Sequence, residues 1–293
     1  LAGKMDRIGM RGTRFAVSMK ARPARVARRV VAGNHRAAAD YLLNWLDAQP
    51  VLLSIVAIGH RMVHGMKRSA PARVTPELLA DLRRLTPYDP EHLPAELALV
   101  DACRRRHPRL PQVLCFDTAF HRRMPRVAKL LPLPRRITVK GVERYGFHGL
   151  SYAYLMEELG RIDPAAARGR VILAHLGNGP SVAAVRTGRS VDTSMGFTPA
   201  AGLVMSTRSG DLDPGLAYFL ARTERMTPGR FQHLVNHESG LLGVSGTSSD
   251  VRDLLSREAR DPRAGEALAL FCYQAKKWIG AYAAALGGLD TLV

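Results

Sequence analysis

The sequence predicts an α/β fold built from two lobes. At 293 residues the chain is longer than the roughly 250 residues at which a single hydrophobic core tends to divide. Apolar runs of strand length alternate with segments of helical spacing along the chain. Hydrophobic residues make up 46% and charged residues 23%, which are ordinary globular values. A cleft between two lobes is then a natural place for a functional site.

Helices and strands are predicted in the first half of the chain from apolar spacing and capping residues. Thr75 is a helix cap and is followed by Pro76, which suits the first helical position. A Pro-rich connector over 125–134 marks a change of composition, so we predict an N-terminal lobe over 1–121 and a C-terminal lobe over 122–293. The predicted elements are a helix over 41–48, a buried strand over 51–58, helices over 75–85 and 93–106, and a strand over 113–116.

The second half repeats this alternation. Thr187 and Gly188 separate two apolar runs, which is typical of a β-hairpin with a tight turn. Residues 288–293 resemble a turn that leads into an interrupted strand. The predicted elements are a helix over 152–159, a strand over 170–174, hairpin strands over 181–186 and 189–192, and helices over 214–222, 228–236, 249–257 and 265–286.

The net charge of +18 would normally suggest nucleic acid or an anionic membrane surface as a partner. The arginines, however, are scattered, and there is neither aromatic interleaving nor zinc-ligand spacing. We interpret the charge as a solvated surface and expect no nucleic-acid partner. Three widely spaced cysteines fit a reducing compartment, and no apolar run reaches the 18 residues that a membrane span needs. A cytoplasmic protein without a membrane partner is predicted.

Two motifs follow predicted strands, where α/β proteins assemble their sites. Residues 59–65 carry Arg61, whose fork could hold a carboxylate or phosphate, although a salt-bridged surface arginine fits equally well. Residues 116–121 present Asp117, a suitable ligand for Mg²⁺ but also an ordinary turn residue.

Two further motifs are rich in glycine. In 144–149, His148 could donate a hydrogen bond to a transferring phosphoryl oxygen while Phe147 lines an apolar pocket; a buried histidine satisfied by backbone is the plainer alternative. Residues 175–181 form a turn whose backbone amides could approach phosphate, or an ordinary turn between strands.

The last two motifs are loops of small and hydroxyl residues. Residues 206–214 surround Arg208, which could neutralise charge on a phosphoryl group, although Asp213 and Pro214 also make a simple helix start. Residues 239–253 could take a nucleotide's phosphates or ribose at a helix N-terminus, or could be a helix capped by Ser249.

Taken in this order, the six motifs closely resemble the acetate kinase family, within the superfamily of acetate and sugar kinases, Hsp70 and actin. The resemblance runs from about Met5 to Val293. It implies a two-lobed, actin-like (ribonuclease H-like) α/β fold with its active site in the interlobe cleft. It also implies a homodimer that transfers the γ-phosphoryl group of ATP to acetate by direct in-line transfer, giving acetyl phosphate and ADP, with Mg²⁺ or Mn²⁺.

Carried onto matching positions, the resemblance implies a role for each motif. Arg61, Asp117, His148 and Arg208 would be the catalytic residues, with Asp117 holding the metal. Arg61 would also bind the carboxylate, together with an apolar pocket formed by Val63, Phe147 and Pro199. The nucleotide would be held by His175, Gly177, Asn178, Gly179, Asp250, Val251 and Arg252.

The chain also departs from the family pattern. The family's first strand and phosphate loop do not precede Met5, and its Gly-rich loop with a second metal-binding Glu does not follow Leu289, so the fold is expected to be incomplete at both termini. Tyr152 stands where a His is usual. Two alternatives to acetate kinase therefore stay open: a propionate or butyrate kinase, since one methylene changes binding by only about 1 to 3 kcal/mol, and a truncated, inactive nucleotide-binding remnant.

Overall fold

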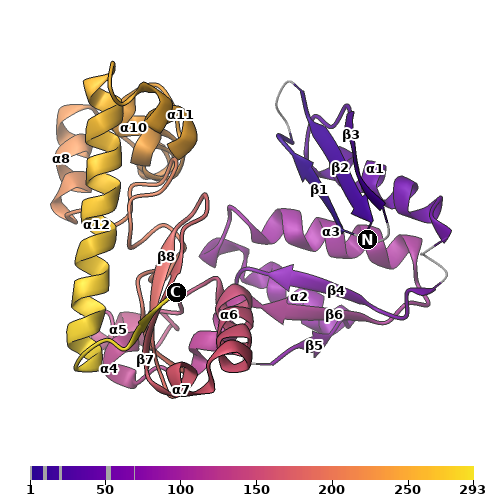
Figure 1. Ribbon diagram of the computed structural model, residues 1–293, viewed down its shortest axis with the longest axis horizontal. Helices are drawn as coiled ribbons and strands as arrows, with labels where there is room; N and C mark the ends of the chain where they lie inside the picture. The colour runs from indigo at the N-terminus through magenta and orange to yellow at the C-terminus, as the bar shows by residue number, and fades with distance from the viewer. Residues whose placement is uncertain (1, 9–11, 20–21, 51–53, 69) are drawn as a thin grey trace. The chain divides into compact units, whose positions relative to one another are not determined.

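The computed structural model describes residues 2–8, 12–19, 22–50, 54–68 and 70–293 (Figure 1). The chain forms two compact units, which we describe separately. The first comprises Leu1–Met62 and Pro71–Cys115, and the second comprises Val63–Ala70 and Phe116–Val293. Each unit combines helices with sheet, which confirms the predicted α/β class. The division into lobes after residue 121 stays a prediction.

The first unit contains an antiparallel sheet that the sequence analysis did not predict. Its strands, in the order β1-β2-β3, are β1 (Ala2–Asp6), β2 (Arg14–Met19) and β3 (Arg22–Arg29). Phe15 and Val17 are two residues apart on β2, so they lie on the same face, and both are buried. The Phe15 ring lies edge-on to Tyr41 and Trp45 of α1 (His35–Asp47), with centroid distances of 5.5 and 5.1 Å. The alternation of Phe15 and Val17, which buries one face of β2, is short and lies in a segment rich in arginine, so it was not recognised in the sequence.

A second sheet of the first unit has the order β4-β6-β5, with β4 (Ile58–Met62), β5 (Ala72–Arg73) and β6 (Gln112–Phe116). The predicted buried strand over 51–58 is wrong for its described part, because strand structure begins only at Ile58 and Val56 is 82% exposed. The backbone N–H of Ile58 donates to Pro111 O at 2.9 Å, so pairing begins where the chain reaches β6. Residues 51–53 lie outside the described part of the chain.

Two helices of the first unit match their predictions closely. The helix α2 (Pro76–Arg84) begins after Thr75, whose hydroxyl accepts from Leu78 N at 3.2 Å. The helix α3 (Leu93–Arg106) has the predicted bounds and buries Leu93, Leu97 and Val100. A short 3₁₀ turn, η2 (Thr86–Tyr88), connects them.

The second unit is built on a sheet with the order β10-β7-β8-β9. Its strands are β7 (Arg170–His175), β8 (Ser181–Arg186), β9 (Arg189–Thr193) and β10 (Thr291–Leu292), with β10 parallel to β7 and the other pairs antiparallel. Thr187 and Gly188 between β8 and β9 have φ angles of 48° and 74°, which confirms the predicted tight hairpin turn.

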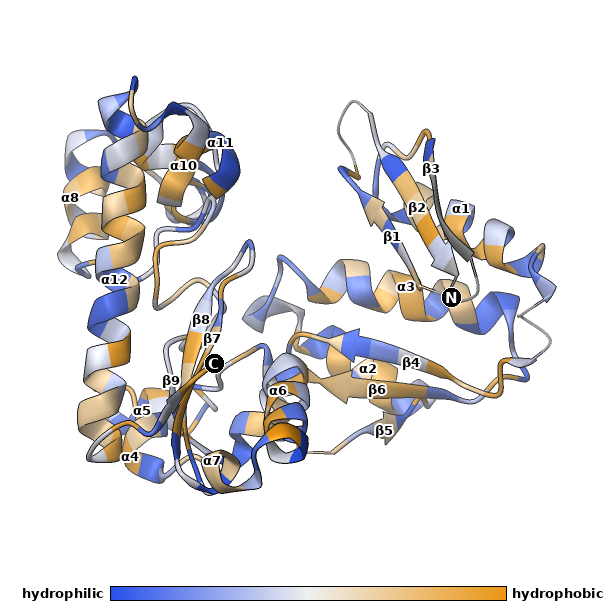
Figure 2. Ribbon diagram, viewed as in Figure 1, coloured by the Kyte–Doolittle hydropathy of each residue, from blue (hydrophilic) through white to orange (hydrophobic). Residues whose placement is uncertain are grey.

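Helices cover both faces of this sheet, which explains why β7 and β8 are continuously apolar. Ile172, Val182 and Ala184 face α12 (Pro262–Leu286) in one core cluster. Residues of opposite parity, such as Val171 and Ala183, pack with Tyr152 of α6 (Gly149–Ile162) in another. Figure 2 shows hydrophobic and hydrophilic residues interleaved along α12, as expected for a helix with one buried face.

The remaining elements of the second unit are short. Asp250, rather than Ser249, caps the penultimate helix, because its carboxylate accepts from Arg252 N at 2.9 Å. Among the helices of the described residues, none has the length and apolarity to cross a bilayer. The elements are η3 (Asp117–Arg123), α4 (Arg126–Lys129), α5 (Arg135–Thr138), α7 (Pro164–Arg168), α8 (Gly215–Thr223), α9 (Pro228–His233), the π-helical η4 (Leu234–Glu238), α10 (Gly240–Ser245) and α11 (Val251–Arg257).

Candidate active site

Asp117 and the start of α6 lie against each other in the second unit. Asp117 is the first residue of η3, directly after β6, and its side chain is 1% exposed. A Cβ at Gly149 would lie 2.0 Å from Asp117 O, so only glycine permits this approach. Since His148 immediately precedes Gly149, the structure brings two predicted catalytic residues into one small region.

His148 is held by hydrogen bonds and by ring stacking. Its φ angle of 59° is in the left-handed region, which is uncommon outside glycine. His148 Nδ1 is 2.8 Å from Ser181 Oγ, which in turn is 2.5 Å from Tyr152 Oη. The His148 ring stacks on His175 with centroids 4.2 Å apart and planes 20° apart. The predicted catalytic and nucleotide-binding histidines are therefore neighbours.

His121 supports the same region and was not among the predicted site residues. The side chain is fully buried, with Nδ1 2.8 Å from Ser190 Oγ and Nε2 3.0 Å from Phe147 O. Burial lowers the pKa of His121 to about 4. A neutral His121 thus ties β9 to the backbone of Phe147, directly before His148. The position of His121 at the end of the 116–121 motif is the sequence signal that could have identified it.

We expect this buried imidazole to make the protein acid-sensitive. Its pKa is about 4 in the folded chain against 6.5 as a reference, so the unfolded chain binds more protons between these values. Stability should therefore fall as pH drops from 6.5 to 4, by on the order of 3 kcal/mol from this group. Urea unfolding across that range should show a weaker pH dependence in His121→Gln. Equal dependence in both proteins would contradict the assignment.

Two of the three residues predicted for the carboxylate pocket pack together. Val63 and Phe147 belong to one buried cluster with Tyr145, Met195 and Met205. Pro199 is also buried, but its described polar contact is with an arginine: its carbonyl accepts from Arg208 Nη1 at 2.6 Å.

Arg208 lies directly on the glycine-rich turn after β7. A Cβ at Gly179 would be 2.2 Å from Arg208 Nη2, so the guanidinium occupies the space that a side chain would take. The two loops are also joined by a hydrogen bond from Ser206 N to Asn178 O at 3.2 Å. Leu242 N, at α10, donates to Ser206 O at 3.0 Å, which anchors the arginine loop to the motif over 239–253. Three predicted motifs are therefore connected.

Two of the residues predicted to lie along the adenosine, Asp250 and Arg252, form an ion pair with each other. Asp250 accepts from Arg252 Nε at 3.1 Å and from Nη2 at 2.6 Å, and this pairing lowers the pKa of the Asp250 carboxyl to about 2. Val251 begins α11 beside them.

The remaining predicted catalytic residue, Arg61, belongs to the first unit, where it is an exposed residue of β4.

Asp117 is the one predicted metal ligand in this region. Among residues 2–8, 12–19, 22–50, 54–68 and 70–293, no group of three or more His, Cys, Asp or Glu side chains could hold a metal. Mg²⁺, however, usually keeps several waters and binds one or two carboxylates together with substrate phosphates. A single carboxylate at Asp117 fits that donor set as the protein's share of the site.

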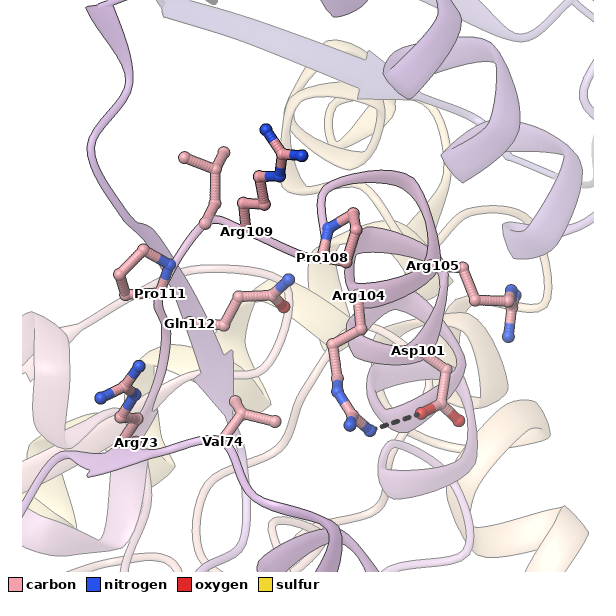
Figure 3. A pocket seen from close by; sticks show the side chains of 10 residues that line it. Arg73, Val74, Asp101, Arg104, Arg105, Pro108, Arg109, Pro111 and Gln112 are labelled. Carbon is pink, nitrogen blue, oxygen red and sulfur yellow. Dashed lines mark ion pairs between the residues drawn. The ribbon is translucent and has the colours of Figure 1, made fainter.

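The first unit contains a separate basic pocket of about 420 Å³ near β5, α3 and β6 (Figure 3). Its arginines do not converge: Arg73, Arg105 and Arg109 point in different directions, and Arg104 pairs with Asp101 at 3.9 Å. This arrangement fits a solvated basic surface better than a site that grips one anion.

Comparison with known proteins agrees with the motif geometry. The model of the Acetokinase family matches residues 1–293. The chain belongs to this family. It is 46% identical over 262 residues to an acetate kinase of Rhodopseudomonas palustris, covering 89% of this chain and 65% of that protein. A propionate kinase of Citrobacter rodentium is 43% identical over 99% of this chain and 73% of its own length.

The fold of this family member also matches solved structures. The crystal structure of Porphyromonas gingivalis acetate kinase superposes with a TM-score of 0.85 at 37% identity, covering 99% of this chain and 75% of that one. The expected actin-like α/β class is therefore confirmed. The chain spans about two thirds (65%) of the length of the Rhodopseudomonas relative.

Proposed function

We propose that this acetokinase family member transfers the γ-phosphoryl group of ATP reversibly to acetate, giving acetyl phosphate and ADP. The observation that carries the proposal is the contact between Arg208 and Gly179, because it joins a cation to the turn predicted to meet the nucleotide's phosphates. Phosphoryl transfer needs alignment and charge stabilisation rather than a covalent nucleophile. The family membership makes ATP and a carboxylate the reactants of choice.

Each residue group then has a task. Backbone amides at Asn178 and Gly179 bind the nucleotide's phosphates, assisted by His175 and Gly177. Arg208 neutralises charge that develops on the equatorial oxygens, and His148 donates a hydrogen bond to the same group. Arg61 binds the carboxylate through its planar fork, and Asp250, Val251 and Arg252 border the adenosine.

Mg²⁺ or Mn²⁺ is proposed as the cofactor, with Asp117 as its protein ligand. When bound, the metal would neutralise phosphate charge. Gly149 approaches the backbone carbonyl of Asp117, which places this residue beside the start of α6, where His148 is fixed. We further propose a homodimer in the cytoplasm, in keeping with the family assignment.

The test is trapping of acyl phosphate as its hydroxamate, with ATP, Mg²⁺ and acetate. Both this chain and the longest reading frame that contains it should be assayed. Acetyl hydroxamate that depends on all three reactants would support the proposal. A protein that binds ATP but forms no hydroxamate in either form would instead be the inactive nucleotide-binding remnant.

Propionate is the second candidate acceptor, because a propionate kinase is 43% identical over 99% of the chain. The proposed methyl pocket is walled by Val63 and Phe147, and its size decides between acceptors that differ by one methylene. Comparing kcat/KM for acetate, propionate and butyrate in the same assay distinguishes the three, with differences of about 10- to 200-fold expected per methylene.

A further inference from the structure

Three side chains of the second unit form a buried hydrogen-bonded chain that ends on His148. Tyr152 Oη lies 2.5 Å from Ser181 Oγ, and Ser181 Oγ lies 2.8 Å from His148 Nδ1. Tyr152 and Ser181 are both 0% exposed. Water therefore does not reach the two hydroxyls, and each hydroxyl proton must find its acceptor within the protein.

The direction of the chain begins at Tyr152. Burial raises the pKa of the Tyr152 phenol, so the group keeps its proton at neutral pH. The backbone of His175 also forms a hydrogen bond with this oxygen. Among the described residues, the side-chain acceptor available to the phenolic proton is Ser181 Oγ. Tyr152 therefore donates to Ser181.

Ser181 then has one proton left to place. In the described part of the chain its hydroxyl has two hydrogen-bond partners, Tyr152 Oη and His148 Nδ1. Because the Tyr152 proton already points at Ser181, the Ser181 proton must point at Nδ1. The opposite arrangement, with Nδ1 protonated, would leave a buried serine proton without an acceptor.

We propose that Ser181, oriented by Tyr152, holds neutral His148 in the tautomer that carries its proton on Nε2. Ser181 and Tyr152 are thus positioning residues, and stacking of His148 on His175 at 4.2 Å fixes the plane in which Nε2–H points. The catalytic consequence rests on the proposed function: only this tautomer lets a neutral His148 donate from Nε2 to a transferring phosphoryl oxygen.

The tautomer can be measured without any assay of activity. Long-range ¹H–¹⁵N correlation spectra of histidine-labelled protein at pH 8.5, with His148 assigned by its loss in His148→Gln, report which nitrogen carries the proton. The wild-type chain should show Nε2–H alone. Ser181→Ala removes the hydrogen-bond partner of Nδ1, so a second population with Nδ1–H should appear. In Tyr152→Phe, Nδ1 remains the acceptor for the Ser181 proton among the described residues, so the His148 signals should still show Nε2–H.

Tyr154→Phe is the matched control, since Tyr154 lies on the same helix but is 62% exposed. It should leave the His148 signals unchanged. A wild-type spectrum with Nδ1 protonated, or a Ser181→Ala spectrum identical to wild type in a folded protein, would overturn the proposal.

Kinetics separate this proposal from the proposed function. In Ser181→Ala, kcat should fall in proportion to the fraction of protein that has lost the Nε2–H tautomer, about 2- to 5-fold, while KM for the carboxylate stays constant. If the tautomer changes but kcat does not, the positioning role is supported and His148 is removed from the reaction.

Discussion

Replacing Arg208 with alanine is expected to lower turnover by about 10³-fold while the protein stays folded. The reason is geometric. The guanidinium lies against Gly179 and is oriented by the carbonyl of Pro199, so its charge is aimed at the turn where the transferring group is proposed to bind. The measurement is the rate of hydroxamate-trapped acyl phosphate, with circular dichroism as the check on folding.

Two variants sharpen this prediction. Arg208→Lys keeps the charge but lacks the planar fork, so it should recover only part of the lost rate. Arg222→Ala removes an exposed arginine of α8 and should leave the rate unchanged. Turnover within a factor of two of wild type in Arg208→Ala would take Arg208 out of the site.

Gly149→Ala is expected to cost about 3 kcal/mol of unfolding free energy, the upper end for overpacking. Its Cβ would lie 2.0 Å from Asp117 O and 2.8 Å from Phe120 Cβ, so α6 and η3 would have to move apart. Urea unfolding measures the loss. Gly160→Ala is the control on the same helix, where the nearest atom lies 3.9 Å away, and it should stabilise the protein by about 0.5 to 1 kcal/mol. Equal effects at the two glycines would contradict the close approach.

Local signals in the sequence predicted much of the fold. Thr75 and Pro76 indicated the start of α2, and Thr187 and Gly188 indicated the β8–β9 turn, because caps and tight turns depend on a few adjacent residues. The strand expected over 51–58 failed because an apolar run does not say where its pairing partner begins. The strands β1 to β3 were missed because the buried pair Phe15 and Val17 gives only a short alternating signal, in a segment otherwise rich in arginine.

The candidate site likewise has residues that the sequence identified and residues that it did not. The motifs around His148, Gly179 and Arg208 could be found in the sequence, and their resemblance to one family indicated their order and chemistry. The side chains that support these motifs could not be found in the sequence. Ser181 and Tyr152, for example, are separated by 29 residues and meet only when β8 packs against α6. His121 was likewise overlooked, since its contacts with Ser190 and Phe147 exist only in the folded chain.

The central claim, transfer of a phosphoryl group from ATP to a carboxylate oxygen, is tested most directly by ³¹P NMR with ¹⁸O-labelled acetate. The account predicts an acetyl phosphate resonance that grows with ADP in equal amounts and carries the isotope shift of ¹⁸O bonded to phosphorus. ADP that appears together with inorganic phosphate alone, with no acyl phosphate at any time in this chain or in its full reading frame, would contradict it.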